Sequence, residues 1–307
     1  MKELVVNPKV SIIVPTYNRA QYLSDALSSI LKQSFDCFEI VVVDNASTDN
    51  TCEIVNEFAD KRIRYFINER NIGATANHNK ALRLCNGDYI CIFSDDDLMD
   101  SDNLQLKVNV LDAYPDVCLV HSDCRLINSD GVEEGESYTN KLQEWNCYKT
   151  QNPLPQSVCF DLMTDNLFVV FPTMMVRASV LKENVIEFNN QLKYFIDWDL
   201  CLKLSLFGDF YYLNKKLISY RQHTTNESSA LTRNICFIEQ VIMRLSIYSL
   251  YKISSFNTSD VIRIYKTSLH KASWNPSFDK DNLSIRPFKD YIIELSSYKK
   301  MKSFFGK

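Results

Sequence analysis

The sequence predicts a doubly wound α/β domain, with a mainly parallel sheet flanked by helices, followed by a helical C-terminal extension. From residue 9 onwards, short strands that are apolar throughout alternate with amphipathic segments, a pattern typical of parallel strands covered on both faces. Polar residues stand directly after several of these strands, where such sheets bind ligands. Past residue 230 the segments read as helices and carry no carboxylate clusters.

The first part of the chain alternates strand and helix. The expected strands are "KVSIIVPTY", "FEIVVVDN", "RIRYFIN" and "DYICIFSDDD". The expected helices between them are "AQYLSDALSSILKQS", "TDNTCEIVNEFAD" and "ATANHNKALRLCN". Amphipathic helices of this length can bury one face each against the sheet and leave the other in water.

The next part predicts a helix over 102–115 and a strand over 116–128. Residues 129–157 are polar and contain two glycines and two prolines, so we expect a loop that suits a flap over a site. "DWDLCLKLSLFG" is predicted to be a helix that ends at Gly208, and "FYYLNKKLISYRQH" a strand. We therefore expect a domain over 1–230 and a helical extension over 231–307.

Composition excludes several classes of protein. The net charge of -4 argues against a nucleic-acid partner, which would need a basic face. The first glycine is Gly73, which excludes a glycine-rich phosphate loop near the N-terminus. The ten cysteines form no CxxC pair, so we expect buried thiols in a reducing compartment. Without a signal peptide or a long apolar window, the chain is expected in the cytoplasm.

Two strand ends offer groups that could hold a nucleotide. After the first, an exposed Tyr17 could stack on a base and Arg19 could approach a phosphate; alternatively, Tyr17 packs within a simple turn. After the second, Asp44 could accept a hydrogen bond from a pyrimidine. Thr48 and Asp49 are better explained as helix caps.

The stretch "FSDDDLM" places Asp95, Asp96 and Asp97 directly after an apolar run. Adjacent carboxylates repel one another and resist burial unless solvent or a cation neutralises them. A divalent cation that bridges the phosphates of a substrate would meet this need. The alternative is a solvated acidic turn.

Two residues later in the chain are further candidates. Asp197 precedes an amphipathic helix in "YFIDWDLCLKL", where it either caps the helix or acts in catalysis. His223 lies in a polar segment after a strand and is solvated unless the fold brings it near Asp96 and Asp97. There, an imidazole could complete a metal site.

In this order, the motifs over residues 9–230 resemble the inverting glycosyltransferases of family two, which have a GT-A fold. The likeness rests on six segments: "VSIIVPTYNR", "IVVVDNASTDNT", "NERNIGATANHNKAL", "GDYICIFSDDDLM", "DWDLCLKL" and "YRQHTTNES". Any one of them is a weak signal, but six in register are specific.

The resemblance implies a role for each candidate. Pro15, Thr16, Tyr17, Arg19 and Asp44 would hold the nucleotide, and Asp95 would contact the ribose or share the metal. Asp96, Asp97 and His223 would hold a divalent cation, Mn²⁺ or Mg²⁺, and Asp197 would be the general base.

The chain also departs from the family pattern at three positions. Ser94 replaces the first acidic residue of the usual Asp-x-Asp-Asp motif, Ile196 replaces a Glu before Asp197, and Asn77 replaces an Arg. These departures leave open which of the three aspartates does which task, and they make Asp199 an alternative base.

The implied activity is that of a hexosyl- or N-acetylhexosaminyltransferase of surface-glycan biosynthesis. UDP is the expected donor nucleotide and dTDP the alternative, and the acceptor is a glycan or a lipid-linked saccharide. A competing reading is a module that binds nucleotide sugar or glycan without turnover. The basic and aromatic end "SYKKMKSFFGK" is typical either of a solvated terminus or of a segment that docks peripherally on the inner face of the cell membrane.

Overall fold

The protein is described here by a computed structural model, in which residues 7–134, 152–156, 167, 169–224, 239–243 and 247 are placed. The strands are β1 (Val10–Thr16), β2 (Phe38–Asp44), β3 (Ile63–Ile67), β4 (Tyr89–Ile92), β5 (Leu98–Met99), β6 (Val117–Ile127), β7 (Met175–Arg177) and β8 (Asp209–Arg221). The helices are α1 (Ala20–Leu31), α2 (Thr51–Glu57), α3 (Ala74–Leu84), α4 (Asn103–Ala113), α8 (Ala178–Glu183) and α9 (Ile196–Leu204), with a short 3-10 helix η2 (Phe171–Thr173).

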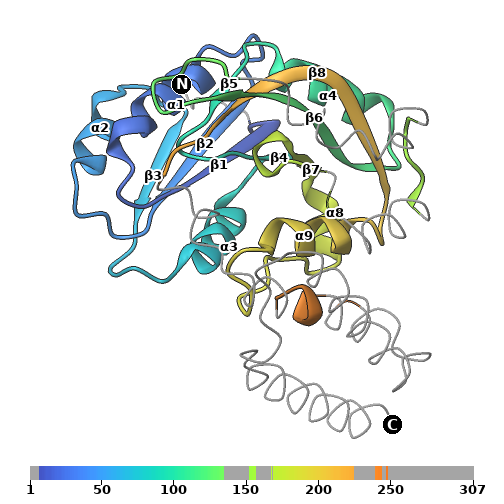
Figure 1. Ribbon diagram of the computed structural model, residues 1–307. Coiled ribbons are helices and arrows are strands. Elements are labelled where there is room, and N and C mark those ends of the chain that lie inside the picture. Colours follow the sequence, from blue (N-terminus) through green and yellow to red (C-terminus); the bar gives the residue numbers. More distant parts are fainter. Residues whose placement is uncertain are drawn as a thin grey trace, which may run out of the picture. The chain divides into compact units, whose positions relative to one another are not determined.

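In the described part of the chain, these strands form one sheet in the order β3-β2-β1-β4-β7-β6-β8-β5 (Figure 1). Strands β3, β2, β1 and β4 run parallel to one another, and β6 is parallel to β8. Only β7 and β5 pair antiparallel with the strands beside them. The prediction of a mainly parallel sheet is therefore confirmed.

Helices cover both faces of the sheet: α1, α2 and α4 lie on one face, and α3 and α8 on the other (Figure 1). The alternation of side chains along a strand explains this arrangement. Ile12 of β1 and Ile40 of β2 belong to the core cluster that includes Leu23 of α1 and Leu104 of α4. Their neighbours along the strands point to the opposite face and are also fully buried, so each strand is apolar on both sides.

Helix α9 differs from its predicted extent. It ends at Leu204, and Gly208 is not its cap. A Cβ atom at Gly208 would lie 2.7 Å from Cys118 Cβ and 2.8 Å from the Asp116 carbonyl oxygen. The glycine is therefore needed for the close approach of two chain segments, and not for a left-handed turn at the end of the helix.

The chain divides into two compact units. The first comprises Met1–Asn190 and Leu200–Thr224 and contains the whole described sheet; the second comprises Gln191–Asp199 and Thr225–Lys307. Residues 239–243 of the second unit are helical. Most of the expected extension over 231–307 lies outside the described residues, as does most of the expected flap over 129–157. The boundary near residue 230 stays a prediction.

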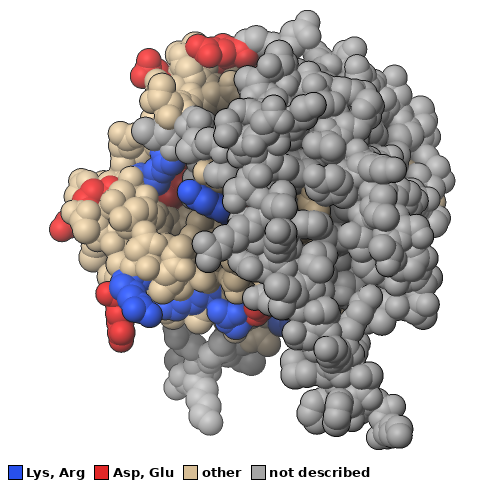
Figure 2. Space-filling model, turned by 60° about the horizontal axis from the view of Figure 1, so that its bottom comes forward, with Lys and Arg blue, Asp and Glu red and all other residues tan. Residues whose placement is uncertain are grey.

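Charged groups of both signs share the surface. On the face shown in Figure 2, Lys and Arg side chains lie next to Asp and Glu side chains, both at a hollow and along the lower rim of the described surface. In the described part of the chain, none of the helices is both long enough and apolar enough to span a membrane.

Candidate active site

The loops after β1 and β2 lie side by side because the two strands are in register, with Thr16 opposite Asp44. Asn18 has a positive φ of 52°, and its side-chain oxygen accepts a hydrogen bond from the Thr48 amide at 2.8 Å. In return, the Asn18 amide donates to Ser47 Oγ at 2.9 Å. These reciprocal bonds fix the two loops to each other. Tyr17 projects from this pair of loops and is 44% exposed, as a side chain that stacks on a base requires.

Asp49 links the same loops to α1. Its carboxylate accepts hydrogen bonds from the Thr51 amide and hydroxyl, at 3.1 and 2.6 Å, and from the amide of Ala20, the first residue of α1, at 3.1 Å. Burial alone would raise the pKa of Asp49, but these bonds outweigh it and hold the pKa below its usual value. Asp49 therefore ties together the starts of α1 and α2, but the N-cap residue of α2 is Asn50 and not the predicted Thr48 or Asp49.

Asp44 is held within the fold. It is 2% exposed, and its two oxygens accept hydrogen bonds from the Ser47 amide at 2.8 Å and from the Tyr65 hydroxyl at 2.7 Å. Burial and the Asp44 carboxylate raise the pKa of the Tyr65 phenol, so Tyr65 remains a hydrogen-bond donor. A contact between Asp44 and a nucleotide base stays a prediction.

Asn77, which stands where the family pattern has an arginine, has a structural role. The Asn77 side chain is buried, donates to the Val43 carbonyl at 2.8 Å and accepts a hydrogen bond from Asn68 at 2.8 Å. Asn68 also bonds Asn45, directly after β2. Asn77 therefore fastens α3 beneath the end of β2 and carries no charge toward a ligand.

The three aspartates after β4 differ in their surroundings. Asp97 is fully buried, whereas Asp95 and Asp96 are partly exposed. Burial and the neighbouring Asp96 carboxylate raise the pKa of Asp95 to about 7, although the Arg19 guanidinium acts in the opposite direction. Burial and Asp96 likewise raise the pKa of Asp97. Burial and mutual repulsion thus make full ionisation of Asp95 and Asp97 costly without a bound cation.

The end of β8 brings His223 and Arg221 to these aspartates. His223 Nε2 lies 3.0 Å from Asp96 Oδ2, as expected if His223 is part of a site and not a solvated loop residue. The Arg221 amide donates to Asp97 Oδ1 at 2.7 Å, and Arg221 Nε donates to the Asp96 carbonyl at 2.7 Å. Segments 124 or more residues apart in the chain therefore meet at this site.

Aromatic and basic side chains surround His223. Its ring stacks on that of Tyr22 with the centroids 4.9 Å apart and an angle of 24° between the planes. The guanidinium of Arg221 lies over the Tyr22 ring, with Cζ 4.9 Å from the ring centroid. Arg19 Nη1 lies 3.4 Å from His223 Nε2. The predicted nucleotide residue Arg19 and the predicted metal ligands Asp96 and His223 are thus neighbours.

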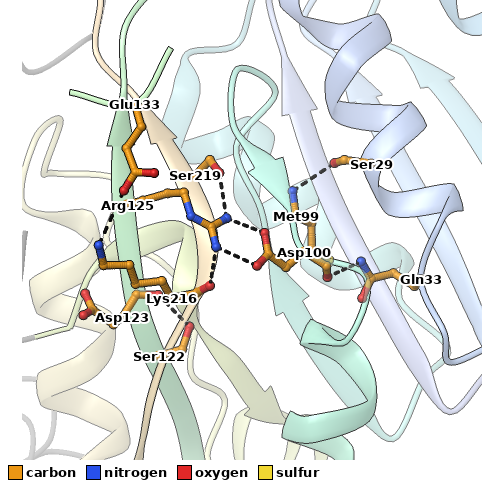
Figure 3. A network of polar contacts seen from close by, with 10 residues as sticks. All are labelled: Ser29, Gln33, Met99, Asp100, Ser122, Asp123, Arg125, Glu133, Lys216 and Ser219. Atoms are coloured by element: carbon orange, nitrogen blue, oxygen red, sulfur yellow. Dashed lines mark hydrogen bonds and ion pairs between the residues drawn. The ribbon is translucent and has the colours of Figure 1, made fainter. Parts of the chain in front are cut away.

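A polar network links β6 and β8 to Asp100, the residue directly after β5 (Figure 3). Arg125 of β6 forms two hydrogen bonds with the Asp100 carboxylate, at 2.5 and 2.8 Å, and one with Ser219 of β8 at 3.2 Å. Gln33, just after α1, donates to the Asp100 carbonyl at 2.7 Å. Because β5 directly follows the three aspartates, this network holds their loop opposite the end of β8.

The aspartate loop fits a hard divalent cation by its donor chemistry. Oδ2 of buried Asp97 accepts no hydrogen bond from any described residue, and such an unsatisfied carboxylate oxygen is a ligand that Mg²⁺ or Mn²⁺ prefers. Within the placed residues, however, no three His, Cys, Asp or Glu side chains converge as a ready metal site. The roles of Asp96, Asp97 and His223 as ligands stay predictions.

The predicted base lies in the second unit, in the first turn of α9. Asp197 is partly exposed, whereas Asp199 is fully buried, which favours Asp197 as the residue that meets a substrate. Burial raises the pKa of Asp197 to about 6, against the hydrogen bond of 2.7 Å that its Oδ1 accepts from the Trp198 amide. A carboxylate with this pKa is ionised at neutral pH and is a better base than an ordinary aspartate.

Sequence reasoning missed Arg221 and Tyr22. Arg221 stands two residues before His223, so that in an extended segment both side chains point the same way. Tyr22 stands three residues after Arg19, one helical turn further on. These spacings were available as signals in the sequence, but the contact between Arg221 and Tyr22 joins distant parts of the chain.

Comparison with known sequences places this geometry among glycosyltransferases. The sequence model described as "Glycosyl transferase family 2" matches residues 11–184. Chondroitin synthase of Escherichia coli is 29% identical over 222 residues, which cover 72% of this chain and 30% of that protein. The poly(ribitol-phosphate) beta-N-acetylglucosaminyltransferase TarS of Staphylococcus aureus is 32% identical over 189 residues, 60% of this chain and 30% of TarS. The chain thus spans under a third of the length of these two relatives.

Comparison with solved structures supports the fold. The structure of Staphylococcus aureus TarS 1-349 in complex with UDP-GlcNAc gives a TM-score of 0.70 at 22% identity, over 92% of this chain and 80% of that one. A mannosyltransferase of Pyrobaculum calidifontis, solved with GDP-Man and Mn²⁺, gives a TM-score of 0.56 at 18% identity, over 97% of this chain and 81% of that one. The predicted GT-A-like fold class is confirmed.

Proposed function

The chain belongs to glycosyl transferase family 2, and we propose that it transfers a sugar, with inversion, from a UDP-sugar to a hydroxyl of a glycan or lipid-linked saccharide. One observation carries the proposal. At the carboxyl ends of β1 and β4, the loop with Tyr17 and Arg19 is joined through His223 to the aspartates that follow β4. A nucleotide diphosphate needs both a stacking ring and a centre for its phosphates.

The choice of UDP rests on a relative. TarS 1-349 was solved with UDP-GlcNAc and with UDP, so we place UDP before dTDP. In this chain, Tyr17 would stack on the base, and Pro15, Thr16 and Asp44 would form the floor beneath it. The charges of Arg19 and Asp96 both act on the pKa of Asp95, and Asp95 would bind the ribose or share the metal.

Asp96, Asp97 and His223 would hold a divalent cation, as suggested by the unsatisfied oxygen of Asp97 and by the Mn²⁺ in the mannosyltransferase structure. Bound there, the cation would neutralise the charge of the diphosphate. Arg19 would contribute a further positive charge to the leaving group.

In the proposed step, the acceptor oxygen attacks the anomeric carbon from the face opposite the diphosphate. Its proton passes to a carboxylate oxygen of Asp197, a bond forms between the acceptor oxygen and the anomeric carbon, and the bond from that carbon to the diphosphate breaks. The electron pair of the broken bond leaves with the nucleotide diphosphate. A single displacement of this kind inverts the configuration of the anomeric carbon.

The test uses the full chain with Mn²⁺ and a set of UDP-hexoses, UDP-N-acetylhexosamines and dTDP-glucose, with nucleotide release as the readout. The proposal predicts release with one of the UDP-sugars and, with a sugar acceptor, a product whose anomeric proton shows the inverted configuration by NMR. A retained configuration would contradict the mechanism. Tight binding of a nucleotide sugar with no release of the nucleotide, either by transfer or by slow hydrolysis, would support the non-catalytic alternative.

Membrane docking by the segment 297–307 stays a prediction, because these residues lie outside the described ones. Sedimentation with anionic liposomes of the full chain and of a version that ends at residue 298 would test it. Equal sedimentation of the two would remove the idea.

A further inference from the structure

The start of helix α9 is held by an acidic side chain from a distant part of the second unit. Glu239 Oε1 accepts a hydrogen bond from the Lys193 amide at 2.9 Å, and Oε2 accepts from the amides of Tyr194 and Phe195 at 2.8 and 3.1 Å. Three successive backbone N–H groups thus converge on one carboxylate. Such an arrangement is a backbone anion site, filled here by the protein itself.

The segment that Glu239 holds leads directly into the turn with the proposed base. The Phe195 carbonyl accepts the first hydrogen bond of the helix, from the Asp199 amide at 3.0 Å, so Phe195 is the N-cap residue. Its ring packs edge-on against Trp198 with the centroids 5.8 Å apart. Asp197 lies between these two residues, and its direction is therefore set by a turn whose first residue is bonded to Glu239.

The burial of Glu239 indicates that its carboxyl group serves these hydrogen bonds. The residue is only 6% exposed, and burying a carboxylate is costly unless hydrogen bonds replace its hydration. A residue needed for packing alone would be better served by an apolar side chain. Charge-assisted bonds to N–H groups are among the stronger ones in proteins, so this contact can hold a segment that has no regular structure of its own.

We propose that Glu239 is a positioning residue for the reaction: its carboxylate anchors residues 193–195 and thereby aims Asp197 at the acceptor hydroxyl. This inference rests on the proposed function, because it assumes that Asp197 is the base. It also assigns a part in catalysis to the C-terminal segment beyond residue 230. Glu239 itself would touch neither the nucleotide nor the sugar.

The decisive variant is Glu239→Gln in the full chain. Glutamine keeps the shape of the side chain but places an NH₂ group where one carboxylate oxygen accepted hydrogen bonds, so that two donors face each other. Glu183→Gln is the matched control, since Glu183 is exposed on α8 in the first unit. A displacement of about 1 Å in a catalytic group can cost about 100-fold in rate, and we expect kcat to fall ten- to 100-fold.

The accompanying readouts separate positioning from a general loss of structure. We expect the KM for the donor and the Kd for UDP with Mn²⁺ to stay within about two-fold of the control. A kcat equal to that of the control would overturn the proposal, and so would a loss of UDP affinity in step with kcat.

Hydrogen exchange on the unmodified chain gives a test that needs no variant. The amides of residues 193–195 should exchange slowly, because each donates to Glu239, and exchange at the rate of a free loop would overturn the proposal. This measurement also separates the two claims. If the unmodified chain turns over no nucleotide sugar, the proposed function fails, and if Asp197→Asn keeps full transfer activity, the assignment of Asp197 as the base fails. In either case, the protection of these amides still decides whether Glu239 anchors the segment.

Discussion

Replacing Asp197 with asparagine removes a carboxylate whose pKa burial raises from 3.8 to about 6. The asparagine oxygen can keep the hydrogen bond from the Trp198 amide, so the shape of the turn is retained. A pKa difference of about two units corresponds to about 3 kcal/mol, and partial exposure of the side chain reduces this to about 2 kcal/mol. Asp197→Asn should therefore stabilise the protein at pH 8 by about this amount.

The sign and the pH window follow from linkage. Because the folded-state pKa is raised, the folded protein binds this proton more tightly than the unfolded chain does. The resulting stability is fully present below pH 3.8 and is lost as the pH rises through about 6. The wild type therefore carries the whole cost of ionisation at pH 8, and the advantage of the variant should shrink to about half at pH 5.

The same substitution should nearly abolish transfer, by about 100- to 10,000-fold in kcat, because it removes the proton acceptor. The Kd for UDP with Mn²⁺ should not change. In the wild type, kcat should fall about ten-fold per pH unit below pH 6 as Asp197 becomes protonated.

The assay compares thermal unfolding at pH 8 and pH 5 with transfer rates for Asp197→Asn and for Asp88→Asn, an exposed control. Higher stability together with lost activity is the signature of a site that is strained for function. Full transfer by the Asn variant, or a fall in its stability at pH 8, would refute the reasoning.

Three further predictions concern stability and support of the site. Lys107 is fully buried, its Nζ has no hydrogen-bond partner among the described residues, and burial lowers its pKa to about 8. In urea titrations, Lys107→Met should stabilise the protein by about 2 kcal/mol at pH 7, and this gain should fade as the pH rises from 8 towards 10.5. A loss of stability at pH 7 would contradict this prediction. Arg125→Met breaks the contact with Asp100, so it should lower the free energy of unfolding by about 1 kcal/mol and weaken the binding of UDP with Mn²⁺ in calorimetry. Unchanged UDP affinity would show that this network does not support the aspartate loop. Val185 is 84% exposed and has a φ of 52°, so Val185→Gly should raise the free energy of unfolding by about 1 kcal/mol, and an unchanged melting temperature would argue against strain there.

Much of the fold could be predicted because its signals are local. Apolar runs such as that of β2 are buried on both sides, and the spacing of Leu23, Leu27 and Ile30 along α1 gives one buried face. The alternation of such strands and helices leaves few topologies open. Gly208 was misread because a glycine after a helix has two common causes, and only the tertiary contact with Cys118 separates them.

The candidate site was predicted in part. The strand ends identified Tyr17, Arg19 and the three aspartates, because parallel strands bring their carboxyl ends together. The pairing of His223 with Asp96 depended on where β8 lies in the sheet. The only sequence signal for Arg221 is its spacing of two residues from His223, and Glu239 has none. Their roles arise from bonds between segments 44 to 125 residues apart, which periodicity along the chain does not encode.

Calorimetric titration with UDP, with and without Mn²⁺, on the wild type and on Asp96→Ala tests the central claim most directly. We expect binding of UDP that is tighter than that of GDP or CDP, depends on the metal and is lost in Asp96→Ala. Equal UDP binding in the presence of EDTA, or unchanged affinity in Asp96→Ala, would contradict the assignment of the aspartate loop as the centre that holds the donor.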